Sequence, residues 1–458
     1  MEVNSRVTTN TNAKVPVEQW RDKKRHLWLM GLIVPTAVLV MLPVVWALNQ
    51  FGWQAAAQAP FWIGPFLVYV VLPLLDRKYG PDGENPPDDV MERLENDKYY
   101  RYCTYSFIPF QYVTVVLGAY LFTASDLSWL GFAGSLAWPA KIGLALSVGM
   151  MGGVGINTAH ELGHKKDSLE RWLSKITLAQ TCYGHFFIEH NRGHHVRVAT
   201  PEDPASARFG ETFWEFLPRS VWGSLKSSWE LEARRLRRLD KSPWHWSNDV
   251  LNAWAMSVVL YGALIAIFGV ALIPYVVISA VFGFTLLETV NYLEHYGLLR
   301  QKVDEPLARR EGRPDEPLAR REGRPDEPLA RREGRPDEPL ARREGRPASG
   351  RYERCAPEHS WNSDHLVTNL FLYHLQRHSD HHANPTRRYQ TLRSMEGAPN
   401  LPSGYASMIG LTYFPPLWRK VMDHRVIAHY DGDLSRVNVH PRVRTKVLAR
   451  CGVTEAAQ

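Results

Sequence analysis

The sequence predicts an all-α integral membrane protein, in which six transmembrane helices carry a cytoplasmic, largely helical and histidine-rich cap. Three observations support this fold class. Apolar residues are gathered in runs of bilayer-spanning length, Lys and Arg lie at one end of these runs, and clustered histidines lie at the same end. The mean hydropathy of -0.28 would suit a soluble protein, but this value averages apolar runs with very polar segments.

Six apolar runs define the expected transmembrane helices. About 20 apolar residues in helical form cross the hydrocarbon core of a bilayer. The runs cover residues 27–48, 61–75, 105–124, 142–159, 250–273 and 274–293. The second run is short, but it begins near the end of the first, and the other runs also form consecutive pairs. We therefore expect three helical hairpins.

The positions of the basic residues predict how these hairpins are oriented. Cytoplasmic loops of membrane proteins are enriched in Lys and Arg. Basic residues flank one end of the helices, whereas none occurs at the hairpin tips near 50–58, 125–136 and 270–274. We expect both termini and all long loops in the cytoplasm, and we expect Lys141, near the outer end of the fourth helix, to snorkel to the interface. The formal charge of +7 suits an anionic inner leaflet, so a lipid bilayer and not a nucleic acid is the expected surface.

Composition divides the chain into four segments. A polar cytoplasmic segment, 1–26, precedes the six-helix region 27–300, which contains a histidine-bearing cytoplasmic loop at 160–249. An insertion at 301–350 leads to a cytoplasmic C-terminal region, 351–458, with the last histidine cluster. The 4 cysteines form no C-x-x-C pair, so we expect free thiols in the reducing cytoplasm.

Residues 304–347 repeat the unit DEPLARREGRP four times without a mismatch. Each copy contains two prolines and one glycine, which oppose a continuous helix. Each copy also balances three acidic against three basic side chains, and it has almost nothing apolar to bury. The expected state is a solvated, disordered loop. An inert insertion and a partner-docking loop both remain open as its role.

Nine histidines fall into four clusters, and the multi-histidine clusters have helical spacing. They are His160 and His164; His190, His194 and His195; His295; and His378, His381 and His382. Residues three or four positions apart share a helical face. The first cluster alone matches the zinc-protease pattern H-E-x-x-H, and a lone histidine such as His295 is more often structural. A catalytic zinc needs only three protein ligands, whereas nine imidazoles suggest two metal ions. Imidazole suits iron, copper, nickel and zinc, so ligand type alone leaves the metal open.

The four clusters and their flanking residues resemble those of one known family. The motifs HELGHKK, EHNRGHH, NYLEHYGL and LQRHSDHH are similar to the histidine motifs of the bacterial membrane-bound alkane 1-monooxygenases, a histidine-box, non-haem di-iron family. The similarity extends from about residue 20 into the C-terminal region and includes GHFFIEHN and PEHSWNSD. The repeat departs from the family, in which a short loop is expected at that position.

The resemblance implies an activity, a cofactor and partners. Two iron ions, held by the nine histidines, would use O2 to hydroxylate the terminal methyl of medium-to-long-chain n-alkanes, giving 1-alkanols. Electrons would come from a rubredoxin and, through it, an NADH-dependent rubredoxin reductase. The protein would lie in the bacterial cytoplasmic (inner) membrane, with its active site facing the cytoplasm.

Other functions are compatible with part of the pattern. A related histidine-box desaturase or aromatic-methyl hydroxylase would share the metal, but the box NYLEHYGL favours the alkane branch. A metal transporter would place ligands along the transmembrane path, whereas here they gather at one face. A zinc protease would leave six of the nine histidines unexplained.

Five carboxylates are candidates to hydrogen-bond the imidazoles and to balance the metal charge. They are Glu161, Asp203, Glu288, Glu294 and Asp380. For Glu161 and Asp380 the alternative is an ordinary solvated charge. Glu288 lies inside the sixth helix and shares a face with Asn291 and His295, and an intramembrane carboxylate normally faces the bundle interior. No catalytic residue beyond the metal ligands is predicted.

Two further sites follow from the alkane hypothesis. An apolar tunnel between helices should reach the metal, and Val68 is a candidate lining residue, with lipid-facing packing as the alternative. A basic patch should receive an acidic rubredoxin. The segment LEARRLRRLDK offers Arg234, Arg235, Arg237, Arg238 and Lys241, although these cations suit membrane phosphates equally well. Residues 404–422 are a further interfacial or packing segment.

Overall fold

The computed structural model describes residues 20–303 and 351–450. The chain divides into a large unit, Met1–Leu299 with Cys355–Gln458, and a small unit, Arg300–Arg354. The repeat, for which we predict disorder, lies outside the described residues. Most of the polar N-terminal segment also lies outside them. In the small unit, β1 (Lys302–Val303) pairs antiparallel with β2 (Arg351–Tyr352).

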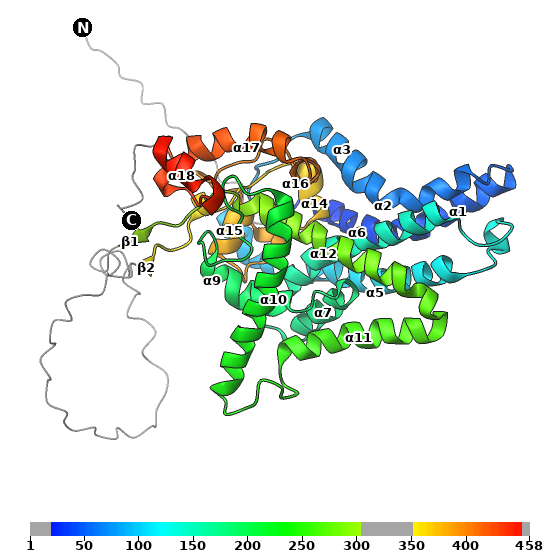
Figure 1. Ribbon diagram of the computed structural model, residues 1–458. Coiled ribbons are helices and arrows are strands. Elements are labelled where there is room, and N and C mark those ends of the chain that lie inside the picture. Colours follow the sequence, from blue (N-terminus) through cyan, green and yellow to red (C-terminus); the bar gives the residue numbers. More distant parts are fainter. Residues whose placement is uncertain (1–19, 304–350, 451–458) are drawn as a thin grey trace, which may run out of the picture. The chain divides into compact units, whose positions relative to one another are not determined.

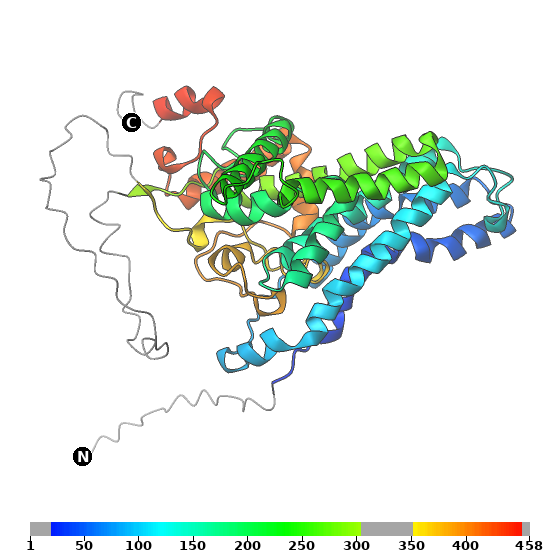
Figure 2. The ribbon, with the colours of Figure 1, turned by 90° about the horizontal axis from the view of Figure 1, so that it is seen from below.

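Within the described residues, the large unit contains six helices that are long and apolar enough to cross a membrane, as the sequence predicts. The first and second combine shorter elements, namely η1 (Arg25–Leu32) with α1 (Ile33–Gln50), and η2 (Ala56–Trp62) with α2 (Ile63–Phe66), η3 (Leu67–Val71) and α3 (Leu72–Tyr79). The others are α5 (Lys98–Thr123), α6 (Trp138–Gly163), α11 (Asp249–Phe268) and η8 (Val270–Leu272) with α12 (Ile273–His295). Figures 1 and 2 show α5, α6, α11 and α12 as long, neighbouring helices. The protein is a multi-pass, all-α membrane protein.

Helix α6 lies at the centre of this bundle and is buried along most of its length. Its glycines allow α12 to approach closely. A Cβ atom added to Gly149 would lie 2.8 Å from the carbonyl oxygen of Ser279, and one added to Gly153 would lie 2.9 Å from that of Gly283. This close packing fixes the ends of α6 and α12, which carry His160 and His295, relative to each other.

Exposed aromatic side chains lie at both ends of the bundle. At the hairpin tips they are Phe51, Trp53, Trp129 and Trp138, and towards the opposite end they are Tyr79, Trp172, Trp244 and Trp246. Amphipathic aromatic rings gather at membrane–water interfaces. The two sets therefore agree with a bundle that spans the bilayer between them.

The remaining elements gather at the end of the bundle opposite the hairpin tips (Figure 1). The α-helices are α4 (Met91–Asn96), α7 (Ser168–Leu178), α8 (Phe186–Glu189), α9 (His195–Arg197), α10 (Phe213–Arg237), α14 (Leu366–Phe371), α15 (His378–Ala383), α16 (Tyr405–Thr412), α17 (Pro415–His429) and α18 (Pro441–Arg450). Short turns are η4 (Asp88–Val90), η5 (Ser128–Leu130, at a hairpin tip), η6 (Ala179–Thr181), η7 (His190–His194), η9 (Pro357–His359), η10 (Tyr389–Thr391) and η11 (Leu434–Arg436). A capping box between Thr212 and Glu215 begins α10, the longest helix of this cap. Cys103, Cys182 and Cys355 are free thiols, as expected.

Candidate metal centre

All nine predicted histidines meet at the cap end of the bundle. They come from the C-terminal ends of α6 and α12, from the turn η7 with α9, and from α15. They form two groups, within each of which one ring nitrogen of every residue lies within 4.8 Å of the others. The first group is His160, His164, His190, His195 and His381; the second is His194, His295, His378 and His382. The sequence left this division open.

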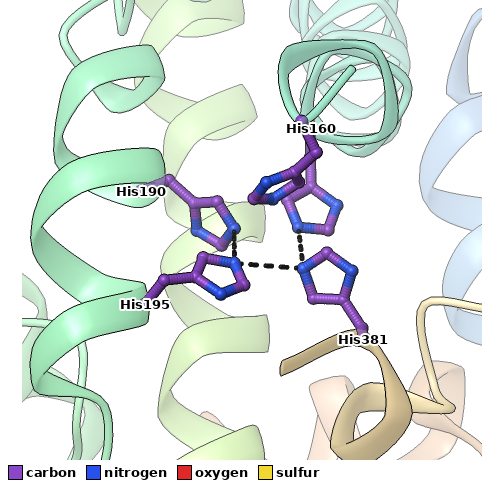
Figure 3. A group of neighbouring side chains, drawn as sticks. His160, His190, His195 and His381 are labelled. Atoms are coloured by element: carbon purple, nitrogen blue, oxygen red, sulfur yellow. Dashed lines mark hydrogen bonds between the residues drawn. The ribbon is translucent and has the colours of Figure 1, made fainter. Parts of the chain in front are cut away.

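In the five-histidine group, Nε2 atoms face one another (Figure 3). The Nε2 of His381 lies 2.9 Å from that of His160 and 3.2 Å from that of His195. The Nε2 atoms of His195 and His190 are 3.1 Å apart. His164 completes the group, and its Nε2 is buried without a hydrogen-bond partner among the described residues.

The four-histidine group has the same arrangement. The Nε2 of His382 lies 2.9 Å from that of His378 and 3.3 Å from that of His194. His378 and His295 are 3.3 Å apart between Nε2 atoms. All four residues are buried.

These spacings fit ligands that share a metal ion. A ring nitrogen binds a first-row metal at about 2.0–2.1 Å, so two such ligands are about 2.9 Å apart at a right angle and about 3.3 Å apart at the tetrahedral angle. A neutral imidazole has only one N–H donor, and three converging Nε2 atoms cannot all satisfy one another by hydrogen bonding. Both histidine groups are therefore compatible with a metal site.

A π-turn places the second histidine cluster. In a regular α-helix, residues four and five positions apart differ by about 100° in direction. Residues His190–His194 instead form one turn of π-helix, which widens the turn. As a result His190 and His195 lie in one group, while His194 reaches the other. π-Turns occur often at functional sites.

Burial keeps the imidazoles available as ligands. Removal from water lowers the pKa of His190, His381 and His382 well below its ordinary value, and the neighbouring rings lower it further. These side chains are therefore neutral near pH 7, with a lone pair free to bind a metal cation.

Two of the five predicted carboxylates contact histidines of the centre. Asp203 Oδ2 lies 2.9 Å from Nδ1 of His194 and accepts a hydrogen bond of 2.6 Å from the hydroxyl of Ser206. Burial opposes ionisation of Asp203, but the charge and hydrogen bond of His194, with that of Ser206, lower its pKa to about 2. Glu294 Oε2 lies 3.3 Å from Nε2 of His378.

The other three carboxylates bind different partners. Glu161 pairs with Lys165 at 2.9 Å, and both oxygens of Asp380 accept from Arg387 at 2.7 Å. Glu288 accepts a hydrogen bond of 2.7 Å from the Tyr183 hydroxyl and contacts the amide of Asn291, which shares its helix face. All three are buried, so none is a solvated surface charge.

A narrow, almost wholly apolar cavity leads to both histidine groups. Its walls come from the second span, α6, α12, α14 and α16, and include Val68, Leu72, Leu286, Val290, Ala406 and Ile409. His160 and His190 of the five-histidine group line it, as does His378 of the four-histidine group. The arrangement can bring an apolar chain against a metal centre while excluding water.

Sequence comparisons place the chain in a family. The fatty acid desaturase family model matches residues 136–412. The chain is 43% identical over 434 residues to alkane 1-monooxygenase of Acinetobacter baylyi, covering 95% of this chain and 92% of that protein. It is 38% identical to alkane 1-monooxygenase of Pseudomonas putida, and the match covers 94% of this chain and 92% of that protein. The chain belongs to the alkane 1-monooxygenase family. It is therefore an oxidoreductase, and its family and its histidine groups imply that it uses a metal and O2.

A more distant relative has a different named substrate. The hydroxylase component XylM of the xylene/toluene monooxygenase of Pseudomonas putida is 26% identical over 62% of this chain and 64% of that protein. The alkane 1-monooxygenases match more of the chain at higher identity, so they are the closer guide to its activity.

The predicted docking cations of this family member differ in their surroundings. Arg234, Arg237, Arg238 and Lys241 are exposed. Arg235 is half-buried, pairs with Glu232 and donates a hydrogen bond of 2.8 Å to the carbonyl of Ser247. Arg235 therefore braces the end of α10, and the other four remain candidates for a partner or for lipid.

Sequence reasoning missed part of the cavity. Asn157 lines it, and its position three residues before His160 on the same helix could have indicated this. Leu72 likewise follows Val68 by one helical turn. The contribution of Ala406 and Ile409 had no comparable signal, because α16 reaches the cavity only through the tertiary fold.

Proposed function

We propose that this protein hydroxylates the terminal methyl group of medium-to-long-chain n-alkanes to 1-alkanols, with O2, at a di-iron centre held by the nine histidines. One observation carries the proposal, namely the convergence of two imidazole groups on a narrow apolar cavity between membrane helices. Membership of the alkane 1-monooxygenase family supports the choice of substrate and reaction.

The substrate explains why the site needs iron. An alkane C–H bond is strong and non-acidic, so general acid–base groups cannot break it. Iron supplies the redox chemistry with O2 that the reaction requires, whereas zinc has none. The five-histidine and four-histidine groups would each hold one iron ion, as the spacing of their Nε2 atoms allows.

The protein's own residues position the substrate and the ligands. The cavity walls would align the alkane along its length and exclude water from its end. Asp203 would fix the ring of His194 through Nδ1, and Glu294 would stabilise positive charge beside His378. A carboxylate that accepts from the ring nitrogen opposite the metal, as Asp203 would, orients the ligand and raises its basicity.

The protein would lie in the bacterial inner membrane, with both termini and the metal centre on the cytoplasmic side. The basic residues at the cap end support this orientation, and there the centre can receive electrons from a cytoplasmic carrier. We infer a rubredoxin as that carrier, reduced by an NADH-dependent rubredoxin reductase. The exposed cations at the C-terminal end of α10 offer a complementary surface to an acidic protein.

Charge reversal tests this surface. Arg234→Glu with Arg238→Glu should raise the KM for rubredoxin several-fold while iron content and kcat at saturating rubredoxin stay unchanged. Lys420→Glu with Lys446→Glu, at exposed cations of α17 and α18, is the matched control. An unchanged KM in the first variant would favour contact of these arginines with lipid phosphates.

Product analysis tests the reaction itself. Membranes with the full chain, iron, a rubredoxin and its reductase would be supplied with octane, dodecane and hexadecane, and the products separated by gas chromatography. We expect 1-alkanols, lost in His378→Ala and retained in His424→Ala, since His424 is exposed on α17. If the protein holds two irons per chain but yields no alkanol, the metal proposal stands and the substrate is wrong. A fatty acyl chain or an aromatic methyl group, as in a desaturase or XylM, would then be tested.

A further inference from the structure

The apolar cavity is too narrow to hold its proposed substrate without rearrangement. Its volume is about 50 Å3, whereas an apolar cavity of about 150 Å3 is known to bind benzene. This inference rests on the proposed function. If that function is right, an alkane must part the walls of the cavity to enter. Alkanes dissolve in the hydrocarbon core of the bilayer, so the wall to examine is the one that faces lipid.

One wall of the cavity differs from the others. Between the second span and α12 the wall is formed by α16, a helix of only eight residues that packs against both. The second span is irregular at the same place, because Leu67–Val71 form one turn of π-helix. A short helix beside a π-turn offers less resistance to movement than two long helices in contact.

Three hydroxyl groups bridge this wall. The hydroxyls of Tyr69 and Tyr413 are 2.9 Å apart, and that of Thr289 lies 3.3 Å from Tyr413. Tyr69 adjoins Val68, Thr289 adjoins Val290, and Tyr413 follows Ile409 by one helical turn, so each bridging residue is next to a residue that lines the cavity. On the outer side, Val70 and Phe414 are exposed. The tyrosine pair thus lies between the cavity and an exposed apolar surface, and Tyr413 also packs against Phe213 and Trp214 of α10.

The tyrosine pair also differs from three other tyrosines of the membrane region. Tyr112, Tyr261 and Tyr275 donate to backbone carbonyls of neighbouring elements, those of Ile176, Gln180 and Val115. Those bonds brace one element against another. In the described part of the chain, Tyr69 bonds instead to another side-chain hydroxyl, and such a bond opens by a rotation of side chains. Gly410 leaves room beside it, since an added Cβ would meet only Tyr69, at 3.9 Å.

We propose that alkanes enter laterally from the bilayer between the second span and α12, past α16, and that the Tyr69–Tyr413 hydrogen bond is the latch of this portal. The latch keeps the cavity closed and dry when no substrate is present. Its opening moves α16 away from the π-turn and joins the cavity to the acyl-chain region. The two tyrosines control access and take no part in the chemistry.

Removal of one hydroxyl from the latch should speed entry without changing the metal centre. We expect Tyr69→Phe and Tyr413→Phe each to raise kcat/KM for octane about three- to tenfold, the range that one lost neutral hydrogen bond allows. The value of kcat and the iron content should stay within about twofold. The double variant should match Tyr413→Phe, because Tyr413→Phe already removes both the bond to Tyr69 and the contact with Thr289. The matched control is Tyr112→Phe, because Tyr112 lines a different apolar groove and its hydroxyl donates to the carbonyl of Ile176.

A second measurement is independent of turnover. An octyl aliphatic diazirine, dissolved in the membranes and photolysed briefly, would label cavity residues such as Val68 and Ile409, and peptide mass spectrometry would report the rate. Faster labelling in the two latch variants and not in Tyr112→Phe supports the portal. Equal labelling in all variants, or slower labelling in the latch variants, overturns it. If the wild-type protein makes no alkanol while latch variants label faster, the portal stands and the proposed reaction fails.

Discussion

Among the acidic residues near the histidines, Asp203 is placed to control a single ligand. It accepts from Nδ1 of His194 at 2.9 Å and is itself held by Ser206 and by the backbone N–H of Ala205. His378 and His382 show the contrast, because their Nδ1 atoms are buried without partners among the described residues. His194 is therefore oriented by a carboxylate, whereas His378 and His382 are oriented by packing and by the backbone of α15.

Asp203→Asn should weaken metal binding by the four-histidine group. An amide removes the charge that supports His194, and loss of such a partner typically costs about 10–100-fold in metal affinity. We expect iron per chain, measured by plasma mass spectrometry after dialysis against a chelator, to fall towards one. Asp126→Asn, at an exposed carboxylate of a hairpin tip that bonds Ser128, should keep two. Two irons retained in Asp203→Asn would show that packing alone orients His194.

At the scale of elements, the transmembrane helices could be predicted because a helix that crosses the hydrocarbon core of a bilayer needs a long run of apolar residues. The predicted run 27–48 corresponds to the observed span Arg25–Gln50, and the predicted run 274–293 corresponds to Val270–His295. The fifth run is the exception. We predicted it to reach residue 273, but the helix ends at Phe268, because Gly269 follows with a φ of 80°.

The second and fourth histidine boxes show what spacing alone could not reveal. The fourth box places histidines at i, i+3 and i+4 on a short helix, α15, and the second box has one extra residue. The wider π-turn accommodates that extra residue. Sequence periodicity assumes one helical geometry throughout, so it could identify these histidines but not their directions.

Deletion of Asn191 should therefore be tolerated. The π-turn would become an α-turn, and its histidines would take the spacing of the fourth box. We expect iron content within about twofold of wild type. Deletion of Ser379 from the regular helix α15 should rotate His378 by about 100° relative to His381 and His382, and iron per chain should fall by half or more. Gel filtration in detergent would confirm that both variants are folded, and equal iron loss in both would contradict the interpretation.

At the scale of the whole molecule, the division into five and four histidines depends on distant parts of the chain. His381 joins His160 and His195, and His382 joins His194, across about 190–220 residues of sequence. The residues of the centre could be predicted because each cluster has its own local pattern. Their grouping and the wall that α16 contributes could not, because both arise only when the cap packs onto the bundle.

The 304–347 repeat is the last large feature of the molecule, and the small unit indicates how it can be removed. Val303 pairs with Arg351 across β1 and β2, so deletion of 304–347 leaves only Ala348, Ser349 and Gly350 between paired strands. Three-residue hairpin loops that end in a residue of left-handed conformation are common, and glycine suits that position.

We expect this deletion to preserve membrane insertion, two irons per chain and the rate of alkanol formation. A shorter connection should also change loop-closure entropy by only about 1–2 kcal/mol, so the thermal unfolding midpoint in detergent should stay within a few degrees. A variant that lacks three of the four copies should behave in the same way. A stepwise loss of iron or activity as copies are removed would show instead that the repeat contributes to the metal centre or to a partner it needs.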